Sequence, residues 1–253
     1  MVEVTEAGLR VGAAASIQGL RPVVRAIIEE LPEHKSRGFA ALLETMSVFA
    51  STQIRNVASI GGNIVTANAV SDINPFLLAT GATLQVMDTE GKTRDIAVEE
   101  KFFLPNGQTS LSRGDIIVSV LIPYTTEGEF VQVYKQSSRG EVDRAVVNAA
   151  MRLVLTSDLQ IVSDVSLVFG GMGDRPLLAS RTMKALQGRK WDRSLVEFAC
   201  SADMLPSDLP LAPDSQGGMV AYRRTLTLSI FFRFFLSVSE KLGRIWIEKR
   251  PAL

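Results

Sequence analysis

Cysteine and histidine are almost absent from this sequence, and their scarcity excludes several kinds of chemistry. The chain has one cysteine, Cys200, and one histidine, His34. A single cysteine excludes an internal disulfide and a cluster held by four thiolates. A zinc centre, a Ser-His-Asp triad and a Cys-His pair also lack their partners. We therefore expect no catalytic residue and no metal ligand in this chain, and chemistry that comes from a bound cofactor.

Net charge and long apolar runs are also missing. Lys plus Arg and Asp plus Glu number 27 each, so nothing in the charge balance favours a nucleic acid as partner. The most apolar window, Leu226 to Leu236, is interrupted by Arg233 and falls short of the roughly 20 residues of a membrane span. Met1 to Ala15 lacks the basic stretch and apolar run of a secretory signal. We expect an intracellular protein without a membrane segment, cytoplasmic or alternatively peroxisomal.

Strand and helix signals alternate along the 253 residues, and 46% of them are hydrophobic. Strand patterns dominate the middle of the chain and helical patterns its end, which is typical of an α+β fold. Pro123 to Glu127 is the best boundary between two parts. The predicted strands are 9–14, 82–87, 93–98, 116–122, 130–134, 145–155 and 160–169; the predicted helices are 17–31, 39–49, 178–186, 194–202 and 220–242.

The last predicted helix carries a stripe of aromatic and aliphatic residues, and we interpret this stripe as a face that packs against the core. Apolar residues recur there at spacings of three and four, which gathers them on one face. These residues are Leu228, Phe231, Phe232, Phe235, Val238 and Leu242.

Residues 53–74 are rich in Ser, Asn, Gly and Ala, and we predict a long functional loop. Within it, Ser59, Gly61, Gly62 and Asn63 can form an anion cradle, because glycine lets backbone N–H groups approach a phosphate. Taken alone the motif is weak. A tight turn without a ligand gives the same signature.

A longer set of motifs lies along the chain: Phe49-Ala50, Gln53-Ile54-Arg55-Asn56-Val57-Ala58-Ser59-Ile60-Gly61-Gly62-Asn63-Ile64, Thr66-Ala67, Ser71-Asp72-Ile73-Asn74-Pro75, Tyr134-Lys135-Gln136-Ser137-Ser138-Arg139, Gly170-Gly171-Met172 and Tyr222-Arg223-Arg224-Thr225-Leu226-Thr227-Leu228-Ser229. In this order the motifs resemble the flavin domains of molybdenum hydroxylases of the xanthine dehydrogenase/oxidase type. The resemblance runs from about Gly12 to Leu242.

The resemblance implies a domain plan and an electron-transfer function. Residues 1–124 would be part of a PCMH-type FAD-binding domain, 125–242 a CO dehydrogenase flavoprotein C-terminal-like domain (a sheet with helices on one face), and 243–253 a tail. FAD would take electrons from 2Fe-2S clusters and pass them to NAD or oxygen. The iron–sulfur and molybdopterin domains of a full-length subunit would be partners, and so would NAD and a second copy of the chain. Aldehyde oxidases share this plan.

The resemblance also assigns site residues. It places Phe49 against the flavin ring and Ile117 in an apolar wall of the pocket, and it places Lys135 as a cation near the ring. A cation there would stabilise the anionic reduced flavin. The remaining positions would contact FAD with polar groups or backbone: Ser59, Gly61, Gly62, Asn63, Thr66 and Asp72.

Each assignment has a simpler structural alternative. Phe49 and Ile117 also fit core positions, and Ser59 fits a turn. Asp72 fits the N-cap of a helix with Pro75 in its first turn. Lys135 fits a solvated charge at the end of a strand.

Family members carry a Gly-rich FAD loop upstream of this region, and we expect the chain to begin after it, as an N-terminally truncated fragment. The expectation is that it binds FAD weakly and does not oxidise xanthine alone. Two alternatives remain: a non-catalytic truncated product that folds in part, and a nucleotide-binding module without a redox role.

Overall fold

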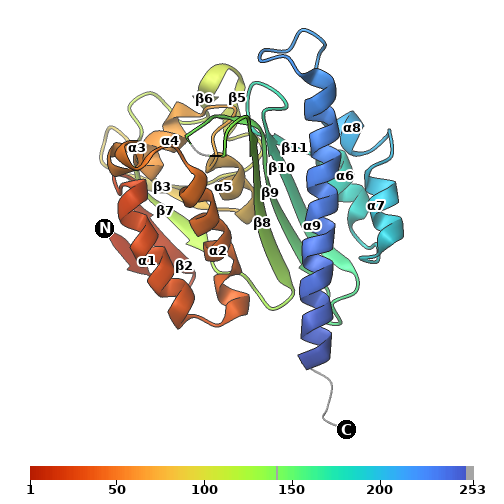
Figure 1. The fold of residues 1–253 in the computed structure, drawn as a ribbon. Helices are drawn as coiled ribbons and strands as arrows, with labels where there is room; N and C mark the ends of the chain where they lie inside the picture. The colour runs from red at the N-terminus through yellow and green to blue at the C-terminus, as the bar shows by residue number, and fades with distance from the viewer. Residues whose placement is uncertain (141, 249–253) are drawn as a thin grey trace.

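The computed structural model describes residues 1–140 and 142–248, and they form two sheets with helices between and around them (Figure 1). The α+β class predicted from the sequence is confirmed. The first half of the chain builds a five-stranded sheet and the second half a four-stranded one.

The first sheet has the order β1-β2-β7-β3-β4, and every neighbouring pair is antiparallel. Its central strand β7 alternates buried and less buried residues except at Ser119 and Val120, which are both buried, and this pattern lets one face pack on helices. The strands are β1 (Val2–Val4), β2 (Gly8–Gly12), β3 (Thr83–Met87), β4 (Thr93–Ala97) and β7 (Ile116–Pro123); a separate two-stranded ribbon consists of β5 (Phe103–Leu104) and β6 (Gln108–Thr109) around a 3-10 turn at Pro105–Gly107.

Five helices belong to this half. Helix α1 starts at a Ser16 cap close to its predicted start, and its buried residues lie at helical spacing. Helix α2 begins six residues before its predicted start, directly after Pro32. The bounds are α1 (Ile17–Glu30), α2 (Glu33–Val48), α3 (Thr52–Val57), α4 (Ile60–Thr66) and α5 (Asn74–Thr80).

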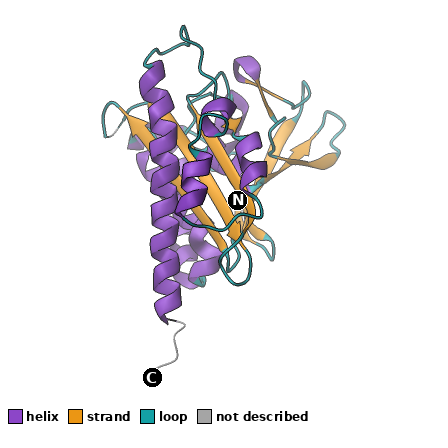
Figure 2. Ribbon diagram, turned by 90° about the vertical axis from the view of Figure 1, so that its right-hand side faces the viewer, coloured by secondary structure: helices purple, strands orange, loops and turns teal. Residues whose placement is uncertain are grey.

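The second sheet has the order β11-β10-β9-β8, again antiparallel throughout. Helices α6 and α9 pack on one face, while α2 and α5 from the first half lie against β8, β9 and β10. Figure 2 shows the long helix α9 standing against the strands. The bounds are β8 (Glu129–Ser137), β9 (Ala145–Leu155), β10 (Val162–Gly170), β11 (Leu177–Leu178), α6 (Ser180–Leu186), α7 (Arg193–Ala199), α8 (Leu205–Asp208) and α9 (Val220–Glu248).

Two hydrophobic cores follow from this arrangement. One fills the first half and reaches Val131 and Ala150 of the second sheet, and the other lies under α9. Helix α9 continues beyond its predicted end at Leu242, and residues 249–253 of the predicted tail lie outside the described residues. No helix in the described part of the chain has both the length and the apolar character needed to cross a membrane.

Candidate functional site

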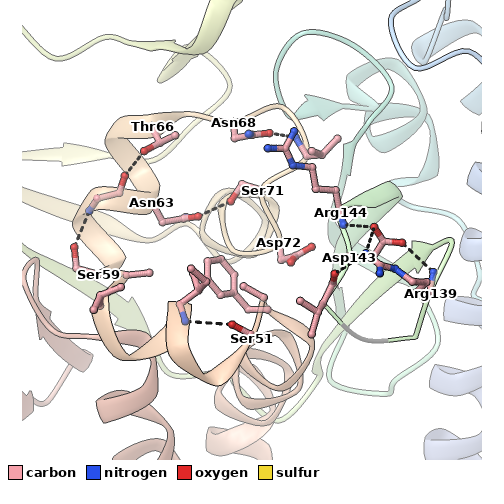
Figure 3. A pocket seen from close by; sticks show the side chains of 18 residues that line it. Ser51, Ser59, Asn63, Thr66, Asn68, Ser71, Asp72, Arg139, Asp143 and Arg144 are labelled. Carbon is pink, nitrogen blue, oxygen red and sulfur yellow. Dashed lines mark hydrogen bonds and ion pairs between the residues drawn. The ribbon is translucent and has the colours of Figure 1, made fainter.

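A cavity of about 800 Å³ opens where helices α3 and α4 face the connection between β8 and β9. Figure 3 shows Ser59, Asn63 and Thr66 on one side and Arg139, Asp143 and Arg144 on the other, with Ser71 and Asp72 between them. Six of the nine residues predicted for the site line this cavity: Phe49, Ser59, Gly62, Asn63, Thr66 and Asp72.

The prediction of a long loop over residues 53–74 is wrong, because the short helices α3 and α4 occupy most of that range. Ser51 begins α3 by accepting a hydrogen bond from the amide of Ile54 at 3.3 Å. Ser59 begins α4 by accepting one from the amide of Gly62 at 3.1 Å. Each cap satisfies an amide that the first turn of a helix leaves free. The wall of the cavity is therefore helical rather than a free loop.

The two adjacent glycines of α4 differ in their surroundings. Gly61 is buried, and its amide donates to the carbonyl of Ala13 at 2.9 Å. A Cβ at Gly61 would lie 2.7 Å from the Cβ of Ala13, so glycine permits this close approach to the segment after β2. Gly62 lines the cavity. Gly61 does not, and it shapes the site only by letting α4 sit against Ala13.

A hydrogen-bond network joins α4 to the start of α5 below the cavity. The side-chain Nδ2 of Asn63 donates to Asn74 Oδ1 at 2.7 Å, and Ser71 Oγ donates to Asn63 Oδ1 at 2.9 Å. Asn74 is fully buried, so its side chain needs these partners. The network fixes the position of α4 relative to the 67–73 segment.

Asp72 lies in the wall between the main cavity and a smaller one of about 140 Å³. Its Oδ2 accepts from Lys135 Nζ at 2.8 Å, and both side chains are about nine-tenths buried. Burial raises the pKa of Asp72, and the hydrogen bond from Lys135 opposes that rise without cancelling it. The alternative interpretation, that Asp72 is the N-cap of α5, is wrong. Ser71 Oγ, and not the Asp72 side chain, accepts from the amides of Ile73 and Asn74.

Lys135 faces the smaller cavity, and Ile117 faces neither. Nζ of Lys135 donates to the carbonyl of Val48 at 2.9 Å as well as to Asp72. It is thus a paired, largely buried ammonium and not the solvated charge of the alternative interpretation. Ile117 is buried in β7 opposite Val86, within the first core. The structure therefore does not bring Ile117, Gly61 or Lys135 to the surface of the main cavity.

Sequence reasoning missed two features of the cavity. Ile54 and Val57 line it while 51% and 79% exposed, so α3 presents an uncovered apolar surface. Arg139, Asp143 and Arg144 supply charge at the opposite side, where Asp143 accepts from the amides of Arg139 and Arg144. The hydrogen bond from the amide of Arg139, with others in this segment, lowers the pKa of the Asp143 carboxyl.

The cavity fits a large amphipathic ligand. Its volume lies in the range of cofactor pockets, roughly 300–1,000 Å³. Exposed apolar side chains of α3 offer a surface for a flat ring, and Arg139 and Arg144 offer hydrogen bonds and positive charge for a diphosphate. These surroundings match the aromatic and anionic parts of a flavin dinucleotide.

Two family models cover most of the chain. The FAD binding domain in molybdopterin dehydrogenase matches residues 1–125, and the CO dehydrogenase flavoprotein C-terminal domain matches residues 132–238. Xanthine dehydrogenase/oxidase of Gallus gallus is 42% identical over 96% of the chain, and that of Rattus norvegicus is 41% identical over 95%. Xanthine dehydrogenase of Oryza sativa subsp. japonica is 40% identical over 96%. The chain spans 18% of the length of each.

Solved structures share the fold. A carbon monoxide dehydrogenase from Hydrogenophaga pseudoflava that lacks the Mo-pyranopterin moiety matches with a TM-score of 0.78 and 19% identity, over 92% of this chain and 75% of the other. Quinoline 2-oxidoreductase from Pseudomonas putida 86 matches with a TM-score of 0.75 and 21% identity, over 95% and 78%.

These matches place the molecule in a class: the chain belongs to the FAD-binding flavoprotein domains of the molybdenum hydroxylases. Its sequence is that of a flavin-binding domain of the xanthine dehydrogenase/oxidase type, with FAD as cofactor. The resemblance drawn from the motifs is confirmed.

Proposed function

We propose that this chain is the electron-accepting flavin part of a xanthine dehydrogenase/oxidase-like enzyme and that the main cavity is its FAD site. FAD, when bound, supplies the redox chemistry: it takes electrons from iron–sulfur clusters and gives them to NAD or oxygen. The proposal rests on the way distant parts of the chain line the same cavity. Residues from two stretches that are far apart in the sequence, 49–72 and 139–144, line one cavity with an apolar side and a cationic side.

Each lining residue has a task in this proposal. Phe49, with Ile54 and Val57, offers apolar surface to the flavin ring and excludes water from it. Ser59, Gly62, Asn63 and Thr66 form the α4 wall. The Ser59 hydroxyl, which accepts from the Gly62 amide, can still donate to a phosphate or ribose oxygen, and the Thr66 hydroxyl, which donates to the Gly62 carbonyl, can accept from a ribose hydroxyl. Asp72 offers a carboxylate at the junction of the two cavities.

The other three predicted site residues do not line the main cavity and support the residues that do. Gly61 lets α4 pack on Ala13, and Ile117 fills the core beneath the first sheet. Lys135 fixes Asp72 and the end of α2 through its two hydrogen bonds. The assignment of a direct flavin contact to Lys135 is replaced in this proposal by support of the residues that line the cavity.

The domain plan and the partners belong to the same proposal. Residues 1–124 form the FAD-binding part, 125–242 the C-terminal flavoprotein part, and 243–253 a tail. Iron–sulfur and molybdenum domains deliver the electrons, and NAD and a second copy of the chain are partners proposed on the family resemblance alone. The cytoplasm is the proposed compartment.

FAD titration of the purified chain tests the proposal. We expect saturable binding, quenched flavin fluorescence and a higher melting temperature. At a free FAD concentration of 100 Kd, linkage predicts about 2.7 kcal/mol of stabilisation, or about 5–10 °C for a chain of this length. Xanthine added to the FAD-loaded chain should give no turnover.

Two outcomes would contradict this account. Absence of any thermal shift at millimolar FAD would remove the cofactor site. Xanthine turnover by the chain alone would mean that electrons enter without the proposed iron–sulfur and molybdenum partners.

A further inference from the structure

Three consecutive carbonyl groups at the end of α2 are bound by buried cationic side chains. Lys135 Nζ donates to the carbonyl of Val48 at 2.9 Å. Arg55 Nη1 donates to the carbonyl of Phe49 at 2.6 Å and to that of Ala50 at 2.9 Å. The last carbonyls of a helix lack partners within the helix, so cations at this end satisfy them and complement the helix dipole.

Arg55 makes four side-chain hydrogen bonds in this arrangement. Its Nε donates to Gln18 Oε1 at 3.1 Å and its Nη2 to Thr52 Oγ1 at 2.9 Å, in addition to the two carbonyls. The residue is only 8% exposed. One guanidinium therefore ties α3, which carries it, to α1 and to the end of α2.

The backbone held by Arg55 is strained. Ala50 has a φ of 40°, in the left-handed region that residues with a Cβ rarely adopt. This turn redirects the chain between α2 and α3, and Phe49, just before it, lines the main cavity. A strained turn persists only when surrounding contacts hold it. The two bonds from Arg55 are such contacts.

We propose that Arg55 is a positioning residue for flavin binding: it holds the Phe49–Ala50 turn so that Phe49 presents its ring to the cofactor cavity. Lys135 assists by holding the preceding carbonyl. Arg55 itself does not line the main cavity; it lines a neighbouring one of about 490 Å³ together with Ala50 and Ser51. The proposal rests on the proposed FAD site, and it adds a residue that acts on the ligand only through Phe49.

The chain contains a matched control. Arg37 is also buried, and its Nη1 donates to the carbonyls of Glu127 and Glu129 at 2.9 Å each. It performs the same kind of carbonyl binding but lies outside the main cavity. Replacing Arg37 removes a buried arginine that binds two carbonyls, and it leaves the contacts of the Phe49–Ala50 turn in place.

The first arm of the test needs no cofactor. Hydrogen exchange of the free chain, followed by mass spectrometry, should show faster exchange across residues 48–56 in Arg55→Met than in the parent, and Arg55→Lys should restore part of the protection. Arg37→Met should accelerate exchange near residues 127–130 instead. Unchanged exchange across 48–56 in Arg55→Met would overturn the proposal, whether or not FAD binds.

The second arm is a double-mutant cycle on the Kd for FAD. Losing charge-assisted bonds that position the ring predicts about tenfold to hundredfold weaker binding in Arg55→Met. In a Phe49→Ala background the same substitution should change the Kd by less than about threefold, because its target is already gone. Arg37→Met should leave the Kd within about threefold of the parent.

Fully multiplicative effects of the Arg55 and Phe49 substitutions would overturn the positioning role, and so would equal weakening by Arg37→Met. If Arg55→Met does not fold, Arg55→Lys carries both arms with a smaller predicted effect. A parent chain that binds no FAD would refute the proposed function, while the exchange arm would still decide whether Arg55 holds the turn.

Discussion

Gly61 and Gly62 are neighbours in sequence with different physical tasks. A Cβ at Gly61 would collide with Ala13, whereas a Cβ at Gly62 would approach only the Ser59 hydroxyl, at 3.0 Å. Gly61→Ala should therefore destabilise the chain by about 1–3 kcal/mol through overpacking. Gly62→Ala should alter the unfolding free energy little and weaken FAD binding, because it narrows the cavity.

Urea denaturation and FAD titration of both variants measure the difference. The reverse order of effects, with Gly62→Ala the less stable variant, would show that the close packing of α4 on Ala13 is wrong.

Asp72 should make stability depend on pH. Burial raises its pKa above the ordinary value of 3.8, so the folded chain holds this proton more tightly than the unfolded chain. The contribution of Asp72 is then most favourable below the unfolded pKa and is lost as pH rises through the folded pKa. The unfolding free energy of the parent minus that of Asp72→Asn should fall as the pH rises from the ordinary pKa of an aspartate through the raised pKa of Asp72 in the folded chain.

Urea unfolding of the two proteins at several pH values gives this difference directly. A difference that grows with pH would mean that the ion pair with Lys135 outweighs burial and lowers the pKa of Asp72.

At this scale the sequence predicted part of the site. Ser59, Gly62, Asn63, Thr66, Asp72 and Phe49 were found because the motif that contains most of them keeps its spacing. The bond from Lys135 to Asp72 joins positions 63 residues apart, and no local pattern indicates it. Ile54 and Val57 were passed over because exposed apolar side chains look like core residues in a sequence.

At the scale of single elements, α3 and α4 show why helix propensity did not predict these two helices. Their sequences contain Gly, Asn, Thr and β-branched residues, which are weak helix formers. Serine caps and packing against the 13–17 segment stabilise them instead. Tertiary contacts override local preference in helices as short as these.

The network between α4 and α5 gives a prediction for these elements. Asn63→Ala would leave Oδ1 of the fully buried Asn74 without its donor, which should cost about 1–3 kcal/mol. Asn68→Ala removes only an exposed bond to the amide of Val70 and should cost less than about 1 kcal/mol. Equal losses in urea denaturation would show that the network does not hold α4 in place.

Most of the apolar stripe predicted on helix α9 faces the second core: Phe231, Val238 and Leu242 are buried, and Leu228 and Phe235 pack against that core. Phe231 and Phe234 are fully buried, whereas Phe232, assigned to the packed stripe, is 47% exposed. Phe234→Ala should therefore cost about 3–5 kcal/mol, and Phe232→Ala less than about 1 kcal/mol. Thermal unfolding of the two variants checks the pair; a larger loss for Phe232→Ala would mean that α9 is rotated about its axis.

For the whole molecule, the sequence predicted the α+β class but not the way the halves meet. Alternating apolar residues marked most of the strands, since a half-buried strand repeats every two residues. The strand order β1-β2-β7-β3-β4 and the packing of α2 and α5 on the second sheet depend on contacts between distant segments. The cavity lies where the 49–72 region of the first half meets the connection between β8 and β9.

A crystal structure of the chain grown with saturating FAD tests the central claim most directly. We predict flavin density in the cavity between α3, α4 and Arg144, with the ring against Phe49 and the diphosphate beside Ser59 and Gly62. Arg55 should still bind the Phe49 and Ala50 carbonyls. Flavin density elsewhere on the molecule, with this cavity filled only by solvent, would contradict the account.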